Sequence, residues 1–324
     1  MLGVAVIGCG GMGSSHARAI ANISGLSVVC GADPSETARS KFSTDFDVPS
    51  FERPSEALQQ NDVEIAIIAM PHDLHATMTI EALAAGKHVL CEKPMAITSA
   101  ECESMNAAAV RAGKKLMVGM TWHFNPATTA LRQIVSSGRI GHPLFAEDII
   151  AKNWNLARRP DWFKARAQGG GMWVTNGIHQ IDRLSWIMGD RITSIDAKSG
   201  TFQHAQDADD MTMAAVRFAG GAFASISCFG FARGVDRHEI AVWGSDGAAR
   251  FVDGTVEIGV EGSWRTVECG DWPPIERELE AFRQSIEHDS KVPVDGEWGK
   301  YTVDVVLAGE ESSRLRKPVE VPEG

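Results

Sequence analysis

The sequence that decides the fold is Gly8-Cys9-Gly10-Gly11-Met12-Gly13, a GxGxxG pattern near the start of the chain. It directly follows the apolar run 2–7 and opens a helical pattern over residues 12–22. In such a strand–turn–helix unit, the first glycine permits a tight turn, the second lets a phosphate approach the backbone, and the third lets helix and strand pack closely. The stretch therefore predicts a phosphate-binding turn, with the positive end of the helix dipole facing the anion.

Apolar runs and helical patterns alternate through the first 121 residues. The runs that read as buried strands are 2–7, 26–32, 64–69, 87–91 and 115–119. The helical patterns between them cover 12–22, 35–46, 73–85 and 99–112, and Pro54 suits the first turn of a shorter helix. This alternation predicts βαβ units, and hence an α/β, Rossmann-type, doubly wound parallel sheet in a dinucleotide-binding domain, residues 1–121.

A single acidic residue extends the phosphate motif to a whole dinucleotide. Asp33 lies 20 residues beyond Gly13, at the end of the second predicted strand. A carboxylate at that place accepts hydrogen bonds from the adenine ribose hydroxyls. Its negative charge disfavours the 2′-phosphate of NADP, whereas Arg39 and Lys41 could fold back toward such a phosphate. We therefore predict NAD as the cofactor and keep NADP as the alternative.

The remaining residues, 122–324, are predicted to form a second domain of the α+β type. Helical patterns cover 127–136, the stretch from the triple glycine 169–171 to Gly189, and finally 276–288 and 299–315. Between residues 193 and 267 the chain shows short alternating stretches, broken by Gly220-Gly221, Asp246-Gly247 and Asp253-Gly254. Those dipeptides favour tight hairpins, so the second domain is predicted to contain an antiparallel sheet.

Composition argues against several classes of partner. The chain has 31 Lys and Arg against 42 Asp and Glu, a formal net charge of -11, which argues against nucleic-acid or anionic-membrane binding. No run approaches the roughly 18 apolar residues of a membrane span. The first predicted strand begins at Leu2, without room for a secretory signal, so we expect a cytoplasmic protein. The six cysteines show neither CxxC pairs nor zinc-like spacing, and no metal site is expected.

Glu92-Lys93-Pro94 is the first of two clusters that bear on chemistry. It follows the fifth predicted strand, at the carboxyl edge where open α/β sheets bind ligands. A lysine at that edge can hydrogen-bond a substrate hydroxyl and, with a lowered pKa, share its proton. The alternative is a surface lysine on a tight turn.

The second cluster lies in the helix that follows the triple glycine. Asn176, His179 and Asp182 stand three residues apart and would share one helix face. Such a ridge could place an imidazole against a substrate hydroxyl, with its other nitrogen held by a neighbour. A half-buried histidine with satisfied hydrogen bonds is the alternative of equal weight.

Together these motifs resemble the Gfo/Idh/MocA family, whose name joins glucose–fructose oxidoreductase, inositol dehydrogenase and MocA. The resemblance covers essentially the whole chain and rests on the Gly8 turn, Pro71 with His75, the stretch Ala85-Gly86-Lys87-His88-Val89-Leu90-Cys91-Glu92-Lys93-Pro94, the turn Gly138-Arg139-Ile140-Gly141, and the triple-glycine helix with His179. It implies a Rossmann domain followed by an open-faced, mainly antiparallel sheet that commonly supports dimers or tetramers. It also implies that Lys93 and His179 form the proton-handling pair beside the nicotinamide.

The motifs and the resemblance assign residues to the predicted site. Cofactor contacts are expected from Gly8, Gly10, Gly11, Met12, Gly13, Asp33, Pro71, His75, Glu92, Lys93 and Trp162. Substrate contacts are expected from Lys93, Trp122, His123, Trp154, Asn176 and His179. Many relatives carry an aspartate near the histidine, in the region where this chain has Asn176. Because an amide cannot take up a proton at physiological pH, we expect acid/base chemistry from Lys93 or His179, with Asn176 positioning the substrate.

Side chains around the predicted pocket leave the substrate open. Indole faces at Trp122, Trp154 and Trp162 suit sugar rings and aromatic carbocycles alike, with core filling as the alternative. Lys152 with Arg158 and Arg159 forms the only notable basic cluster, which suits either an acidic substrate or a solvated loop.

The leading prediction is an NAD(P)-dependent oxidoreductase that acts on a secondary alcohol or ketone of a sugar, polyol or cyclic diol. Glycoside cleavage through transient oxidation, with NAD tightly bound, is one alternative. A non-catalytic NAD(P)-dependent sensor is the other, although a sensor would need neither Lys93 nor His179.

Overall fold

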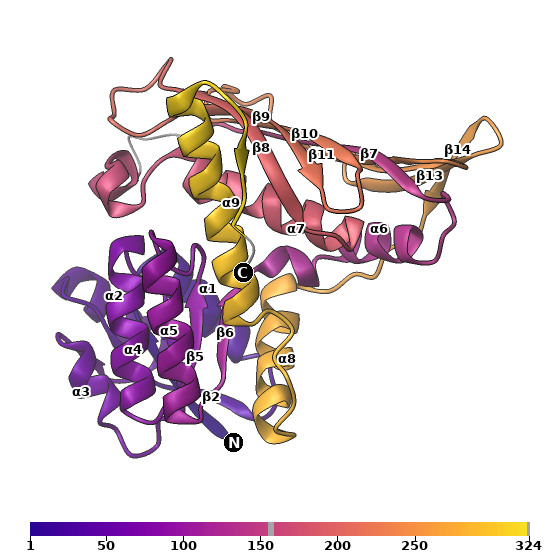
Figure 1. The fold of residues 1–324 in the computed structure, drawn as a ribbon. Helices are drawn as coiled ribbons and strands as arrows, with labels where there is room; N and C mark the ends of the chain where they lie inside the picture. The colour runs from indigo at the N-terminus through magenta and orange to yellow at the C-terminus, as the bar shows by residue number, and fades with distance from the viewer. Residues whose placement is uncertain (155–158, 323–324) are drawn as a thin grey trace. The chain divides into compact units, whose positions relative to one another are not determined.

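The structure, a computed structural model, describes residues 1–154 and 159–322 (Figure 1). It contains two compact units. The first comprises residues 1–121 and 273–300, and the second comprises residues 122–272 and the chain from Tyr301 onward. Helix α9 (Gly296–Leu315) begins in the first unit and ends in the second. Within the described ranges, no helix is both long and apolar enough to cross a membrane.

The first unit is built on a six-stranded parallel sheet in the order β3-β2-β1-β4-β5-β6. Its strands are β1 (Leu2–Ile7), β2 (Leu26–Ala32), β3 (Ser50–Phe51), β4 (Ile65–Ile68), β5 (His88–Glu92) and β6 (Leu116–Gly119). Strands β1, β4 and β5 are almost wholly buried, as expected for a parallel sheet covered on both faces. The strand order reverses between β1 and β4, where sheets of this type bind ligands. The predicted doubly wound Rossmann sheet is confirmed.

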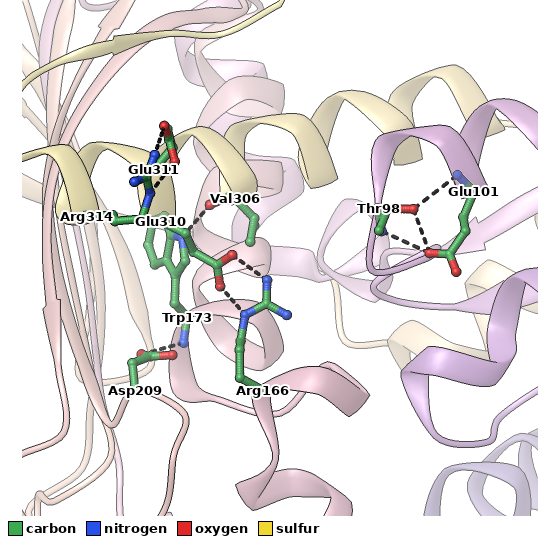
Figure 2. A network of polar contacts seen from close by, with 9 residues as sticks. All are labelled: Thr98, Glu101, Arg166, Trp173, Asp209, Val306, Glu310, Glu311 and Arg314. Atoms are coloured by element: carbon green, nitrogen blue, oxygen red, sulfur yellow. Dashed lines mark hydrogen bonds and ion pairs between the residues drawn. The ribbon is translucent and has the colours of Figure 1, made fainter.

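Local sequence explains where the helices of this unit begin. They are α1 (Gly11–Ile20), α2 (Glu36–Phe46), α3 (Pro54–Leu58), α4 (His75–Ala84) and α5 (Ser99–Ala112). The Ser35 side chain caps α2 by accepting from a backbone N–H, and Thr98 with Glu101 forms a reciprocal capping box at the start of α5 (Figure 2). Pro54 occupies the first position of α3, where its missing N–H costs no helical hydrogen bond.

Residues 273–300 pack with the first unit. Helix α8 (Pro274–Glu287) lies against α1. The Val118 N–H donates to the Val294 carbonyl at 3.0 Å, and Lys115 Nζ lies 2.6 Å from Asp289 Oδ1. The sequence-based division had assigned this segment to residues 122–324, because a helical period does not reveal which sheet a helix packs against. That one unit serves cofactor binding and the other substrate binding stays a prediction.

The second unit contains a nine-stranded sheet in the order β14-β13-β12-β11-β7-β10-β9-β8-β15. Its strands are β7 (Pro143–Ala151), β8 (Ile192–Gly200), β9 (Met211–Phe218), β10 (Phe223–Phe229), β11 (Arg237–Gly244), β12 (Ala248–Val252), β13 (Thr255–Val260), β14 (Ser263–Val267) and β15 (Val319–Glu320). Neighbouring strands are antiparallel except β7 with β10, which are parallel. At the turn Asp253-Gly254 both residues have positive φ, 51° and 77°, as a two-residue type I′ hairpin requires. The mainly antiparallel sheet is confirmed.

The central strand β7 was not predicted. Three of its alternate positions, Ala146, Asp148 and Ile150, are buried. An aspartate among them interrupts the apolar alternation by which a strand is recognised in a sequence. The charge of the buried Asp148 is compensated by an ion pair with the Arg183 guanidinium. Both side chains are fully buried.

The two faces of the large sheet differ. Helices α6 (Pro126–Ser136) and α7 (Ile178–Met188) cover one face (Figure 1). On the other face Phe145, Phe223 and Trp243 are 38, 55 and 37% exposed. Phe145 pairs in register with both Phe223 and Trp243, and the rings of Phe145 and Trp243 are 5.8 Å apart. The open face therefore carries an aromatic row across three neighbouring strands.

Candidate active site

The turn after β1 has the shape that a phosphate needs. Gly8 has a φ of 100°, in the left-handed region, and a Cβ at Gly13 would lie 1.9 Å from the Gly8 carbonyl oxygen. A Cβ at Gly10 or Gly11 would meet nothing within 4 Å, so space is open over the start of α1. No side chain caps this helix, which leaves its first N–H groups to an anion. The residues present therefore fit the pyrophosphate of a dinucleotide.

Asp33 follows β2 and lies beside this turn. Its Oδ2 accepts from the Cys9 N–H and its Oδ1 from the Ser35 N–H, each at 2.9 Å. A carboxylate has about four lone-pair sites, so both oxygens can still accept from ribose hydroxyls. Arg39 donates to the carbonyl oxygens of Asp33 and Pro34, at 2.8 and 2.9 Å. Arg39, which could bind a 2′-phosphate, thus lies beside Asp33, whose carboxylate disfavours a 2′-phosphate.

A buried hydrogen bond joins the glycine-turn helix to strand β5. His16 Nε2 lies 2.7 Å from Glu92 Oε1, and both side chains are buried. Burial raises the pKa of the Glu92 carboxyl, but the hydrogen bond with His16 and the nearby positive charge of Lys93 outweigh it, so the pKa is lowered on balance. Glu92 is predicted as a cofactor contact. In the structure its side chain is buried and hydrogen-bonds His16 of α1, the helix that follows the glycine turn. Lys93 follows it directly and is half-buried.

Sequence reasoning missed His16. The residue lies three positions after Gly13, on the inward-facing side of α1. A histidine on an apolar helix face is a signal that a buried polar partner exists, because such a ring needs a hydrogen bond. Nothing in the sequence shows that this partner is Glu92, 76 residues away.

His75, predicted as a cofactor contact, is held by the main chain on both sides. The side chain is fully buried, with Nδ1 2.8 Å from the Pro94 carbonyl and Nε2 2.8 Å from the Met70 carbonyl. Burial lowers the pKa of His75, and a neutral imidazole has one N–H to donate. These contacts favour a structural role, in which the ring fixes the segments that follow β4 and β5. Pro71 is half-buried and immediately precedes a 3₁₀ turn, His72–Leu74.

The helix after the triple glycine begins with a π-helical turn. Residues Trp173–Gly177 form a π-helix, and α7 continues from Ile178. Hydrogen bonds from i to i+5 widen this turn, which changes the spacing from Asn176 to His179, whereas His179 and Asp182 both lie within α7. Asn176 and His179 are half-buried, whereas Asp182 is fully buried. The predicted ridge of three residues is wrong, because Asp182 belongs to the interior.

Asp182 pairs with His123 inside the second unit. His123 Nε2 lies 2.7 Å from Asp182 Oδ1, and its ring stacks on Trp186 with centroids 4.6 Å apart. Only 8% of His123 is exposed. These contacts favour a packing role over the predicted substrate contact. His123 lies in a 3₁₀ turn, Thr121–Phe124, where a short sequence does not show which side chains face inward.

Asn176 is oriented by a lysine from the end of β7. Lys152 Nζ donates to Asn176 Oδ1 at 3.2 Å, and Asn176 Nδ2 donates to Thr175 Oγ1 at 2.7 Å. Lys152 is half-buried. Burial, and then the charge of Arg159, lower the pKa of its ammonium. From the sequence, Lys152 could be either a solvated loop charge or part of a site for an acidic substrate. In the structure it hydrogen-bonds Asn176, the residue predicted to position the substrate.

Two family models match the chain. The model described as an oxidoreductase family with an NAD-binding Rossmann fold matches residues 2–120, and the model of the Gfo/Idh/MocA C-terminal domain matches residues 128–250. The chain belongs to the Gfo/Idh/MocA family. The resemblance found in the sequence motifs is thereby confirmed, and residues 2–120 match the NAD-binding Rossmann fold of that family.

Individual relatives agree with this assignment. The chain is 30% identical over 219 residues to a 1-carboxy-3-chloro-3,4-dihydroxycyclohexa-1,5-diene dehydrogenase of Comamonas testosteroni, covering 67% of this chain and 55% of that protein. It is 30% identical over 189 residues to the inositol 2-dehydrogenase of Salmonella typhimurium, covering 56% of this chain and 53% of that protein. The chain thus spans about half the length of these curated relatives. An oxidoreductase domain protein from Kribbella flavida has the same fold, with 26% identity, a TM-score of 0.92 and 99% of both chains covered.

The tryptophans expected at the Gfo/Idh/MocA site differ in exposure. Trp154 is fully buried, and Arg159 Nε donates to its carbonyl oxygen at 2.8 Å. Trp162 is half-buried and its ring lies 3.9 Å from that of Phe163. Trp154 therefore fits core filling, and Trp162 keeps surface for a ligand. Arg158 of the predicted basic cluster lies outside the described residues.

A buried ion pair that sequence reasoning missed lies under Trp122. Arg183 of α7 and Asp148 of β7 form a bidentate pair. The Arg183 guanidinium lies 4.4 Å from the centre of the half-buried Trp122 ring, and the His238 ring stacks with Trp122 at 6.2 Å. Burial, and then the charge of Arg183, lower the pKa of His238. The pair leaves no sequence signal, because its partners lie 35 residues apart on different elements.

The π-helix is anchored at Trp173 (Figure 2). The Trp173 N–H donates to Asp209 Oδ2 at 2.9 Å, and its indole N–H donates to the Val306 carbonyl at 3.0 Å. Arg166 and Glu310 form a bidentate ion pair in the same network. Burial raises the pKa of Asp209 to about 7, although the Trp173 N–H favours its ionised form.

The raised pKa of Asp209 predicts a pH dependence of stability. An unfolded aspartate titrates near a pH of about 3.9. Between about pH 4 and 7 the folded chain therefore holds a proton that the unfolded chain has released, and the free energy of unfolding falls as the pH rises. The loss is up to about 1.4 kcal/mol for each unit of pKa difference. Asp209→Asn should remove this part of the slope in urea unfolding measured across the same range of pH.

Asp210→Asn is the matched control. Burial raises the pKa of Asp210, but backbone N–H groups of Gln203, Phe202 and His204 outweigh it, so the pKa is lowered on balance. The contribution of Asp210 is present at higher pH and is lost as the pH falls below about 4. Asp210→Asn should therefore keep the slope at higher pH. An identical slope in Asp209→Asn and the parent would contradict the assignment.

Proposed function

We propose that this Gfo/Idh/MocA chain is an NAD-dependent oxidoreductase acting on a secondary alcohol, or the matching ketone, of a sugar, polyol or cyclic diol. The observation that carries the proposal is the buried His16–Glu92 hydrogen bond, which joins the glycine turn to the strand end that bears Lys93. Relatives named as dehydrogenases of inositol and of a dihydroxycyclohexadiene support the substrate class. The Asp33 carboxylate supports NAD over NADP, because it repels a 2′-phosphate.

Three side chains would handle the substrate hydroxyl. When bound, the nicotinamide supplies the site that accepts or donates hydride. Lys93 as a neutral amine, or His179 as a neutral imidazole, would accept the proton of the hydroxyl and hold it as an ammonium or imidazolium. Asn176 orients the hydroxyl, because its amide can donate and accept hydrogen bonds but cannot be protonated. Trp122 and Trp162 offer ring faces to the carbon skeleton.

Substitution of the proton-handling residues tests this mechanism. Lys93→Met and His179→Gln should lower kcat about 10²- to 10⁴-fold, since each removes general acid–base catalysis. NAD⁺ affinity should fall much less than kcat, because the phosphate turn and Asp33, which hold the pyrophosphate and the ribose, are unchanged. Initial rates of NADH formation with a panel of inositols, aldoses and cyclic diols measure the first quantity. Quenching of tryptophan fluorescence by NAD⁺ measures the second.

Lys198→Met is the control, since Lys198 lies in an exposed ion pair with Asp196 on β8. It should leave turnover and NAD⁺ affinity unchanged. Turnover of Lys93→Met near that of the parent would exclude Lys93 as the acid/base. NAD⁺ that leaves the parent only on denaturation, with no net NADH formed, would favour glycoside cleavage by transient oxidation instead.

We further infer that the open face of the large sheet forms a homodimer or homotetramer interface. The aromatic row of Phe145, Phe223 and Trp243 is an exposed apolar feature on a sheet face. Contiguous apolar surface of this kind marks interaction sites on folded proteins. A second copy of the same face would cover this aromatic row.

Trp243→Glu tests the interface. A carboxylate placed in an apolar interface without a partner is costly, so the variant should show the mass of a smaller species in light scattering. Val110→Glu, on α5 with Val110 83% exposed, is the control and should keep the parental mass. A Trp243→Glu protein with the parental mass would contradict the inference.

A further inference from the structure

Two cations of the second unit lie half-buried near the predicted substrate-positioning residue. Lys152 Nζ donates to Asn176 Oδ1 at 3.2 Å. Arg159 is also half-buried, and its guanidinium lies 4.7 Å over the Phe163 ring while its Nε donates to the Trp154 carbonyl. The charge of Arg159 acts on Lys152 strongly enough to lower the pKa of the ammonium, in addition to the effect of burial.

No carboxylate of the described residues forms an ion pair with either cation. Asp236, whose charge acts on Lys152, and Asp148 of β7 both have other partners. Asp148 is held in its fully buried pair with Arg183, and Asp236 is exposed, with its Oδ1 accepting from the Asn153 N–H at 3.0 Å. The chain as a whole carries a net charge of -11. The ammonium of Lys152 therefore lies next to Asn176 with its charge only partly offset, by the exposed Asp236.

Such an arrangement is costly unless an anion completes it. Like charges that are partly removed from water repel each other and lose hydration. An ammonium has three donors, and Asn176 uses one of those of Lys152. The others can be given to a carboxylate, in a charge-assisted hydrogen bond about twice as strong as a neutral one.

An aromatic surface belongs to the same patch. The His238 ring stacks with Trp122, with centroids 6.2 Å apart and ring planes within 24°. His238 of β11 pairs in register with Ile150 of β7, two residues before Lys152, and after burial and the charge of Arg183 the charge of Lys152 also lowers the pKa of His238. A flat indole beside a cation suits a ring-shaped ligand that bears an acid group.

We propose that the substrate of this site carries a carboxylate, which Lys152 binds while Asn176 holds the neighbouring hydroxyl. The inference rests on the proposed function and adds its substrate class: sugar acids and cyclic diol acids rather than neutral polyols. A carboxylate fits better than a phosphate, because its single negative charge matches the one ammonium of Lys152, whereas a phosphate group carries nearly two charges at neutral pH. Lys152 is then a specificity-determining residue.

Binding of matched pairs to the NADH complex of the full chain tests the proposal. The pairs are D-glucuronate with D-glucose, D-galacturonate with D-galactose, and benzoate with benzyl alcohol. Calorimetry measures the dissociation constant of each compound. The acid of at least one pair should bind about tenfold or more tightly than its neutral partner, as expected for a charge-assisted hydrogen bond. Lys152→Met should weaken the acids about tenfold more than the neutral compounds and so remove that preference. Lys152→Arg should retain part of it.

Lys164→Met is the matched control, since Lys164 forms an ion pair with Asp161 in the same region. It should keep the preference for acids. Equal binding of acid and neutral partners, binding of no compound, or an intact preference in Lys152→Met would overturn the proposal. An equal loss for acids and neutral compounds in Lys152→Met would show that Lys152 only positions Asn176, and would also overturn it. Tighter binding of glucose 6-phosphate than of D-glucuronate would overturn the assignment to carboxylates.

NADH binding, measured first with the same protein, separates the two hypotheses. A parent chain that does not bind NADH would contradict the proposed function itself. A parent chain that binds NADH but shows no preference for acids contradicts only the carboxylate site.

Discussion

The hydrogen bond between His16 and Glu92 is the interaction on which the predicted chemistry of the first unit depends. It is buried, so loss of either partner would leave a polar or charged group without compensation. His16 follows the glycine turn on α1, and Glu92 immediately precedes Lys93. The position of the phosphate turn and the position of the lysine are therefore fixed by one contact. Asp33 adds a second link, since it accepts from the backbone of the same turn.

The second unit follows the same physical rule with other residues. Buried polar groups must find partners, and here those partners fix the start of the helix that bears Asn176 and His179. Trp173 is tied to the Asp209 carboxylate and to the Val306 carbonyl. Burial makes the Asp209 carboxylate costly to ionise, so the stability of this anchor responds to pH. The proposed chemistry thus depends on half-buried side chains supported by fully buried ones.

Much of the fold could be predicted from the sequence, because alternation of strands and helices and the hairpin dipeptides are local signals. The strand β7 could not, since the buried Asp148 on it makes sense only with Arg183, which is distant in the sequence. At the candidate site, the glycine turn, Asp33 and Lys93 lie where motif spacing places them. The predicted ridge of Asn176, His179 and Asp182 is wrong, because Asp182 is buried and paired with His123, which is distant in the sequence. The pairing of His16 with Glu92 is tertiary, and no spacing rule contains it.

The central claim is that the glycine turn, Asp33 and the His16–Glu92 tie together form an NAD site in this chain. Titration of the purified protein with NAD⁺ and NADP⁺ tests this claim most directly. Quenching of the fluorescence of its nine tryptophans measures the binding. The account predicts saturable binding of NAD⁺ with one site per chain, tighter than the binding of NADP⁺. Failure of both nucleotides to bind would contradict it.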